Sequence, residues 1–169
     1  METEIKLEVR DLEPVRQRLQ ALGADCLSVV EETNVYFDRD HELQDRQESL
    51  RLRQDSQVRL TWKGPTVFEE GVVNRPEVEI TVSSFSDVLA LLERLGYREI
   101  ERLAKRRETW RFLGTEIALD SLAFGQFVEL EGPTKIITEM ARRLGLDPRQ
   151  GLSESYRKLK RERGFSKSI

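Results

Sequence analysis

Glu2-Thr3-Glu4-Ile5-Lys6-Leu7-Glu8-Val9 is the stretch from which the fold of this 169-residue chain can be inferred. Side chains alternate between the two faces of a β-strand, so the charged residues at positions 2, 4 and 6 share one face and the apolar residues at 5, 7 and 9 share the other. The same pair of glutamates returns at Glu77-Val78-Glu79 and at Glu129-Leu130-Glu131. Each pair is followed by a segment with helical spacing that ends in Leu-Gly. The sequence therefore predicts a strand–helix unit that is used three times, with two carboxylates on each strand.

Composition indicates one folded domain, which we expect to span residues 1–169. Hydrophobic residues make up 38% of the chain and charged residues 35%, and the apolar residues are periodic, which is not typical of disorder. The net charge of −3 lacks the basic excess of nucleic-acid-binding proteins, so no nucleic-acid partner is expected.

The location of the protein is inferred from three further features. The chain is charged from Glu2 onward, which is not typical of a signal peptide, and no apolar run approaches the length of a membrane span. The single cysteine, Cys26, cannot form an intrachain disulfide. We therefore expect a cytoplasmic protein that does not bind a membrane.

Alternation of apolar and polar residues predicts eight short strands, mostly joined by hairpins. They lie at about 2–10, 27–38, 49–53, 58–63, 75–82, 100–113, 116–122 and 126–131. Helices are predicted over about 11–22, 84–95, 132–144 and 153–162, and loops over 39–48 and 66–73. An antiparallel sheet of this size often closes to remove its edges. The expected fold is therefore α+β, an eight-stranded antiparallel β-barrel (tunnel) with the helices packed outside.

Most strands repeat one charge sign at alternate positions. A solvated sheet face is the ordinary explanation, but like charges at adjacent positions of one face repel unless an opposite charge lies between them. If helices cover the apolar faces, the charged faces line the interior, where they need water and a charged ligand. Carboxylates bind divalent cations through oxygen, and Arg and Lys bind phosphates. The residues themselves therefore point to a polyphosphate bound together with Mg2+ or Mn2+.

Eight motifs resemble, in order, those of the CYTH or triphosphate tunnel metalloenzyme superfamily, and are most similar to its class IV adenylyl cyclase branch. Glu2-x-Glu4-x-Lys6 resembles its ExExK signature. The later motifs are Tyr36-Phe37-Asp38, Leu50-Arg51-Leu52-Arg53, Leu60-Thr61-Trp62-Lys63-Gly64-Pro65, Arg75-Pro76-Glu77-Val78-Glu79, Lys105-x-Arg107, Ile117-Ala118-Leu119-Asp120 and Phe127-Val128-Glu129-Leu130-Glu131-Gly132. Ser155-Tyr156-x-x-Leu159 resembles the last helix of the same branch.

The resemblance implies roles for individual residues of this chain. It implies metal ligands at Glu2, Glu4, Asp120, Glu129 and Glu131, with Asp120 as a further ligand or water holder. It implies phosphate-binding residues at Lys6, Arg51, Arg53, Lys63, Lys105 and Arg107. The residues expected to be catalytic are Lys6, Glu4 and Glu131, with Lys6 contacting phosphate or assisting proton transfer. Glu77 and Glu79 are expected near a second metal or paired with the basic side chains.

Three functions are compatible with these motifs. A class IV adenylyl cyclase converts ATP to cyclic AMP and pyrophosphate, and this is the first expectation. A triphosphatase would release orthophosphate from tripolyphosphate, a nucleoside triphosphate or thiamine triphosphate, and a non-catalytic protein would only bind polyphosphate or nucleotide. No adenine-selective residue is identified in the sequence. The expected partner is a small-molecule triphosphate (ATP or tripolyphosphate), and the resemblance also implies a homodimer.

Tyr156 lies outside the charged strand faces. Two interpretations are open for it: a lid contact, or the anchor of the last helix. The anchor is favoured, because an aromatic ring at the start of a short helix commonly packs that helix onto the domain.

Overall fold

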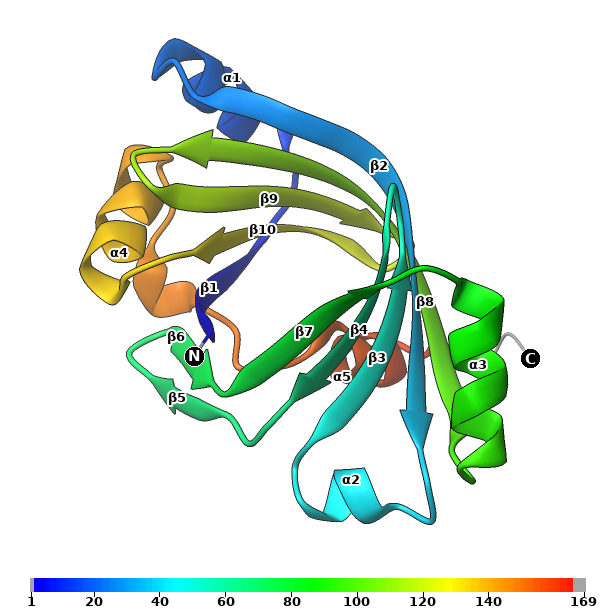
Figure 1. The fold of residues 1–169 in the computed structure, drawn as a ribbon. Helices are drawn as coiled ribbons and strands as arrows, with labels where there is room; N and C mark the ends of the chain where they lie inside the picture. The colour runs from blue at the N-terminus through cyan, green and yellow to red at the C-terminus, as the bar shows by residue number, and fades with distance from the viewer. Residues whose placement is uncertain (1, 166–169) are drawn as a thin grey trace. The chain divides into compact units, whose positions relative to one another are not determined.

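The computed structural model describes residues 2–165 and contains one ten-stranded sheet (Figure 1). The strand order is β5-β6-β1-β10-β9-β8-β2-β3-β4-β7. The strands are β1 (Glu2–Val9), β2 (Asp25–Asp38), β3 (Ser49–Gln54), β4 (Val58–Lys63), β5 (Val67–Glu69), β6 (Val72–Arg75), β7 (Glu77–Val82), β8 (Arg98–Phe112), β9 (Thr115–Leu122) and β10 (Gly125–Glu131). The helices are α1 (Glu13–Ala21), α2 (Glu42–Asp45), α3 (Phe85–Arg94), α4 (Thr134–Arg143), the 3-10 turn η1 (Pro148–Gln150) and α5 (Tyr156–Glu162).

The antiparallel α+β fold predicted from the sequence is confirmed. Over the described residues, the sheet differs from the prediction in having ten strands instead of eight, and in not being closed into a barrel by hydrogen bonds. Strands β5 and β6 occupy the segment that was expected to be a loop. They form because Glu70 and Gly71 both have positive φ, of 50° and 84°, which suits a two-residue hairpin turn. Within residues 2–165 the hydrogen-bonded order ends at β5 and at β7, so hydrogen bonds do not close the sheet into a ring.

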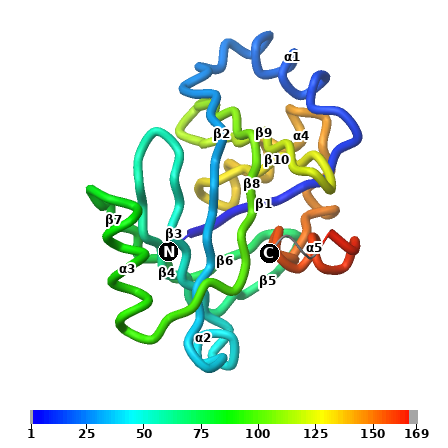
Figure 2. Tube along the Cα trace, turned by 90° about the vertical axis from the view of Figure 1, so that its right-hand side faces the viewer, coloured from blue at the N-terminus to red at the C-terminus, as the bar shows by residue number. Residues whose placement is uncertain are grey.

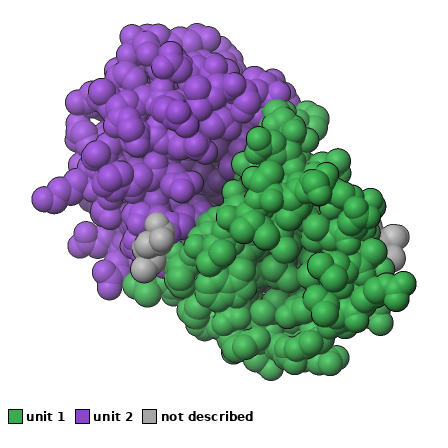
Figure 3. Space-filling model, in the orientation of Figure 1, with its two compact units in different colours: residues 1, 30–67, 75–104 green, residues 2–29, 68–74, 105–169 purple. Residues whose placement is uncertain are grey.

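The chain divides into two compact units, which are coloured separately in Figure 3. Of the described residues, unit 1 contains 30–67 and 75–104, and unit 2 contains 2–29, 68–74 and 105–165. The two long strands β2 and β8, which Figure 2 traces from end to end, each contribute residues to both units.

Unit 2 is built on a sheet with one apolar face and one charged face. Its core joins the apolar side chains of β1, β9 and β10 to those of α1 and α4. Ile5, Ile117 and Leu130 are fully buried there, together with Leu19 of α1 and Ile137 of α4. Burial of an aliphatic side chain of this size contributes about 1.5–3 kcal/mol, so these helices hold the apolar face and leave the charged face on the other side of the sheet.

Unit 1 repeats this division with a smaller core. Val35, Phe37 and Leu52 of β2 and β3 are buried against Leu92 of α3, and apolar residues of β4 pack around them. Ser84 begins α3, because its hydroxyl accepts a hydrogen bond from the amide of Asp87. The remaining side chains of these strands, which are mostly charged, lie on the opposite face.

Helix α5 departs from the expectation that the helices cover apolar sheet faces. Its first residue, Tyr156, is buried, and the centre of its ring lies 5.0 Å from that of Phe127. Phe127 is the register partner of Asp120 and therefore lies with it on the charged face of unit 2. The helix docks there because Tyr156 carries both an apolar ring and a hydroxyl group. No helix of the described residues is long and apolar enough to cross a membrane.

Candidate functional site

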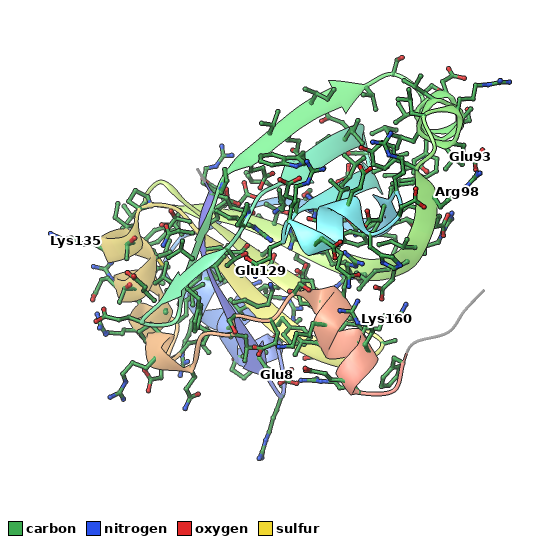
Figure 4. All side chains as sticks on the ribbon, turned by 90° about the horizontal axis from the view of Figure 1, so that it is seen from below. Glu8, Glu93, Arg98, Glu129, Lys135 and Lys160 are labelled. Atoms are coloured by element: carbon green, nitrogen blue, oxygen red, sulfur yellow. The ribbon has the colours of Figure 1, made fainter. Side chains whose placement is uncertain are left out.

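The charged face of unit 2 is set by the strand register. Glu4 lies opposite Glu131, and Lys6 opposite Glu129, across β1 and β10. Asp120 of β9 lies opposite Arg107 of β8. Opposite residues of antiparallel strands project to the same face, so residues far apart in the sequence come together. We call the following set the unit 2 cluster: Glu4, Lys6, Lys105, Arg107, Asp120, Glu129 and Tyr156. The side chains of unit 2 are drawn in Figure 4, where Glu129 is labelled.

Lys6 lies between two carboxylates. Its Nζ is 3.7 Å from Oε1 of Glu4 and 3.4 Å from Oε1 of Glu129. Only 6% of the Lys6 side chain is exposed, so its ammonium group is largely removed from water and is balanced by these acids. Lys6 is therefore paired with a carboxylate of its own strand and with one of the neighbouring strand β10.

Asp120 is the most enclosed acid of the unit 2 cluster, with an exposed fraction of 0%. Arg107 donates from Nε to Oδ1 at 2.7 Å and from Nη2 to Oδ2 at 2.6 Å, and it also pairs with Glu129. Lys105 Nζ donates to Oδ2 at 2.9 Å. A bidentate guanidinium–carboxylate pair fixes the plane of both groups, so Asp120 holds these two cations in a defined arrangement.

Tyr156 completes this arrangement from α5. Its hydroxyl donates to Oδ2 of Asp120 at 2.9 Å, and the ammonium groups of Lys6 and Lys105 lie 4.6 Å and 4.9 Å from the centre of its ring. Burial raises the pKa of the Tyr156 phenol well above its ordinary value, and the negative charges of Asp120 and Glu129 act in the same direction. The phenol is therefore protonated at neutral pH and remains a donor.

The residues expected to bind a metal are distributed over the same face. Carboxylate oxygens are the donors that Mg2+ and Mn2+ prefer, and Glu4 and Glu131 are direct neighbours in the register. Glu2 is buried and Glu131 is exposed. Within residues 2–165, however, no three acidic, histidine or cysteine side chains are grouped so as to hold a metal ion. Carboxylate donors and the strand register fit the binding of Mg2+ or Mn2+. Glu4 and Glu129, however, have basic side chains as their partners in the structure. The roles of these glutamates as metal ligands therefore stay a prediction.

Unit 1 carries a second set of charged residues on strands β3, β4 and β7. Arg51, Thr61 and Glu79 are successive partners in the register. Arg51 Nη2 donates to Oγ1 of Thr61 at 3.3 Å and lies 3.6 Å from Oε2 of Glu79, and Thr61 donates to the same carboxylate oxygen at 2.7 Å. One row further along, Lys63 Nζ is 3.0 Å from Oε2 of Glu77. Lys63 and Glu77 therefore pair between neighbouring strands, whereas Arg51 and Glu79 pair across β4.

Arg53 belongs to a network that the sequence did not reveal. Its Nε lies 3.3 Å from Oδ1 of Asn34 and 3.3 Å from Oε1 of Glu32, and Asn34 donates to that same oxygen of Glu32 at 2.8 Å. Glu32 and Asn34 are almost fully buried. We call the following set the unit 1 cluster: Glu32, Asn34, Arg51, Arg53, Thr61, Lys63, Glu77 and Glu79.

The predicted residues fall into the two units as follows. Glu2, Glu4, Lys6, Lys105, Arg107, Asp120, Glu129 and Glu131 lie in unit 2, and Arg51, Arg53, Lys63, Glu77 and Glu79 lie in unit 1. The sequence prediction missed Glu32, Asn34 and Thr61. The sequence pattern gave no clear signal for Glu32 and Asn34, because they stand in a run of four polar residues, 31–34, in which no apolar alternation marks the buried face.

Comparison with known proteins is consistent with this geometry. The model of the CYTH domain family matches residues 1–154. A curated protein of Methanocaldococcus jannaschii, named "Putative adenylate cyclase", is 28% identical over 142 residues, which cover 82% of this chain and 81% of that protein.

Solved structures match over nearly the whole chain. A protein of Pyrococcus horikoshii OT3 has a TM-score of 0.80 at 26% identity, covering 94% of this chain and 99% of that one. A Hippeastrum protein, described as a "Putative adenylyl cyclase" with a dominant triphosphatase activity, has a TM-score of 0.73 at 20% identity, with 96% of each chain covered. At this lower identity the likeness concerns the fold alone.

Proposed function

The chain belongs to the CYTH domain family, and on this premise we propose that it is a metal-dependent enzyme that acts on a triphosphate. The proposal rests on one observation: in each unit, lysine and arginine side chains are paired with carboxylates on the charged face of the sheet. Paired and partly desolvated cations of this kind suit a multiply charged anion, because phosphate oxygens can replace carboxylates as their partners.

The first candidate reaction is the cyclisation of ATP. It is supported by the name of the Methanocaldococcus jannaschii relative, "Putative adenylate cyclase". The ribose 3'-oxygen would form a bond to the α-phosphorus, lose its proton, and displace pyrophosphate as the bond from the α-phosphorus to the bridging oxygen breaks.

The second candidate reaction is hydrolysis, and it is favoured by the activity described for the Hippeastrum protein of the same fold. Water would lose a proton and form a bond to a terminal phosphorus of tripolyphosphate or of a nucleoside triphosphate, while the bond from that phosphorus to its bridging oxygen breaks. Orthophosphate would be formed, and pyrophosphate or the nucleoside diphosphate would be the leaving group. The two candidates share the same substrate class and differ in the nucleophile.

In this proposal the basic side chains bind and orient the phosphates. Arg51, Arg53 and Lys63 do so in unit 1, and Lys6, Lys105 and Arg107 do so in unit 2. Glu2, Glu4, Glu129 and Glu131 are the proposed ligands of Mg2+ or Mn2+, which when bound would neutralise charge that develops on the phosphate oxygens. Glu77 and Glu79 hold Lys63 and Arg51 in place on the charged face of unit 1.

A product assay tests the proposal and separates its two candidates. The protein is incubated with ATP or with tripolyphosphate, in the presence of Mg2+ or Mn2+, and the products are identified by chromatography. Cyclic AMP with pyrophosphate identifies a cyclase, and orthophosphate identifies a triphosphatase. Tight binding without product over hours would instead identify a non-catalytic binding protein, and the absence of both binding and turnover would refute the proposal.

A further inference from the structure

We infer that Tyr156 is a positioning residue, which holds Asp120 and through it orders Lys105 and Arg107 for the triphosphate. This inference rests on the proposed function only for the identity of the anion. The placement of the four side chains is independent of it, since all four belong to unit 2 and each contact is a short, direct one.

The hydrogen bonds of Asp120 show what the phenol contributes. Oδ1 accepts from Nε of Arg107, and Oδ2 accepts from Arg107, Lys105 and Tyr156. Both carboxylate oxygens are therefore occupied by donors from this chain, on a residue with no exposed surface. A carboxylate enclosed in this way serves better as an internal anchor for cations than as a ligand of an exchangeable metal ion, which would have to displace these donors.

Tyr156 differs from the other donors because it is neutral and comes from a different kind of element. Lys105 and Arg107 lie on the strand next to Asp120, whereas Tyr156 is the first residue of α5. A neutral donor strengthens the hold on Asp120 without adding a third positive charge that would repel the other two. Its ring also faces the ammonium groups of Lys6 and Lys105, which are attracted to an aromatic face.

Helix α5 has attachments that do not involve the phenolic hydroxyl. The hydroxyl of Ser155 accepts from the amide of Lys158 and begins the helix. At its far end Arg163 donates to Glu8 at 2.7 Å and 2.8 Å and to the carbonyl oxygen of Phe124 at 2.8 Å. Because these contacts and the ring packing remain, Tyr156→Phe is expected to leave α5 in place while it removes the bond to Asp120.

The binding experiment uses the full chain and isothermal titration with tripolyphosphate in the presence of Mg2+. Tyr156→Phe is expected to weaken binding about tenfold, since a hydrogen bond to a charged group is lost from the network. The matched control is Tyr97→Phe, which removes a hydroxyl in unit 1 beside Arg39 and is expected to bind as the wild type does. In an Asp120→Asn background, Tyr156→Phe is expected to have almost no further effect, because the two residues act through one contact.

A second readout does not depend on any triphosphate. Nitrogen NMR follows the Nε–H signal of Arg107, which donates to Asp120, with Arg102 Nε–H, which donates to Glu99 at 3.1 Å, as the internal reference. We expect the Arg107 signal to shift and to exchange faster with water in Tyr156→Phe, while the Arg102 signal is unchanged. A helix anchor without a positioning role would move neither signal.

The two failures can be told apart. If the wild-type protein binds no triphosphate, the proposed function fails, and the Arg107 signal alone decides whether Tyr156 positions that side chain. If the wild type binds but Tyr156→Phe binds equally well with an unchanged Arg107 signal, the positioning role is refuted. Additive effects of the Tyr156 and Asp120 substitutions would refute it as well.

Discussion

At the scale of single residues, the carboxylates of this protein act mainly on its cations. Glu77 and Asp120 each hold a lysine of the adjacent strand, and Glu79 holds Arg51 across β4. A buried charge without a partner is costly, so these acids keep the basic side chains ordered when no anion is bound. Glu131 differs from them because it is exposed at the end of β10.

Glu131→Ala tests the catalytic role that its motif implies. We expect at least a hundredfold lower turnover of the triphosphate, because a metal ligand would be lost, with an unchanged melting temperature, because the side chain is exposed. Steady-state kinetics and thermal unfolding measure the two quantities. Glu139→Ala on α4, another exposed glutamate, is the control and should retain full turnover. Full turnover in Glu131→Ala would contradict the assignment.

Glu108 gives a prediction for the pH dependence of stability. Two hydrogen bonds from Arg16 hold the pKa of Glu108 at about 2, and Arg106 acts in the same direction, while burial opposes them. Because the pKa of Glu108 is depressed in the folded state, its ionised carboxylate stabilises the folded protein. This contribution to the free energy of unfolding is complete above about pH 4.5 and is lost as the pH falls toward 2. It amounts to roughly 3 kcal/mol.

The variant Glu108→Gln tests this linkage by urea unfolding at pH 7 and near pH 2. We expect it to be less stable than the wild type at pH 7, and the difference to shrink strongly near pH 2. Glu139→Gln should follow the wild type at both pH values, since its side chain is exposed. A difference for Glu108→Gln that is equally large at both pH values would show that the ion pair is not its cause.

At the scale of elements, the β5–β6 turn and the 3-10 turn η1 set the positions of the segments around the unit 2 cluster. The β5–β6 turn packs against η1, where the carbonyl oxygen of Pro148 would lie 2.1 Å from a Cβ added to Gly71. The amide of Leu152, just beyond, donates to the carbonyl oxygen of Lys6 at 2.8 Å. The chain that leads into α5 is therefore held against β1 and against the β5–β6 turn.

Gly71→Ala should destabilise the protein by more than about 2 kcal/mol, because a Cβ there meets backbone and φ is +84°. Gly114→Ala is the matched control. It has φ of +74° but no atom within 4 Å of the added Cβ, so we expect only the conformational cost of about 1 kcal/mol. Chemical denaturation measures both variants, and equal losses would show that crowding at Gly71 is unimportant.

At the scale of the whole molecule, an anion that binds only the folded chain should raise its melting temperature. At a tripolyphosphate concentration of 100 times Kd, mass action adds about 2.7 kcal/mol to the free energy of unfolding. Differential scanning fluorimetry should show this rise, and sodium chloride at the same ionic strength should not reproduce it. Lys63→Gln is expected to reduce the rise, whereas Lys135→Gln on α4 should preserve it. An unchanged melting temperature with tripolyphosphate would argue for a protein that binds no triphosphate.

The sequence by itself determined the antiparallel α+β fold and the charged and apolar faces of its strands. Both follow from the period of two, which assigns Glu4 and Lys6 to one face and Ile5 and Leu7 to the other. It also predicted most strands to within two residues, because Gly, Pro and the Leu-Gly helix ends mark their limits.

Only the tertiary structure decided which charges meet. Local patterns cannot determine the strand register, yet the register brings Asp120 to Arg107, and Arg51 to Thr61 and Glu79. Nor could they show that Tyr156, which the sequence suggested as a helix anchor, donates to Asp120. Tyr156 lies 36 positions after Asp120, so the contact depends on where α5 docks. Docking is decided by packing over the whole of unit 2 rather than by the residues next to Tyr156.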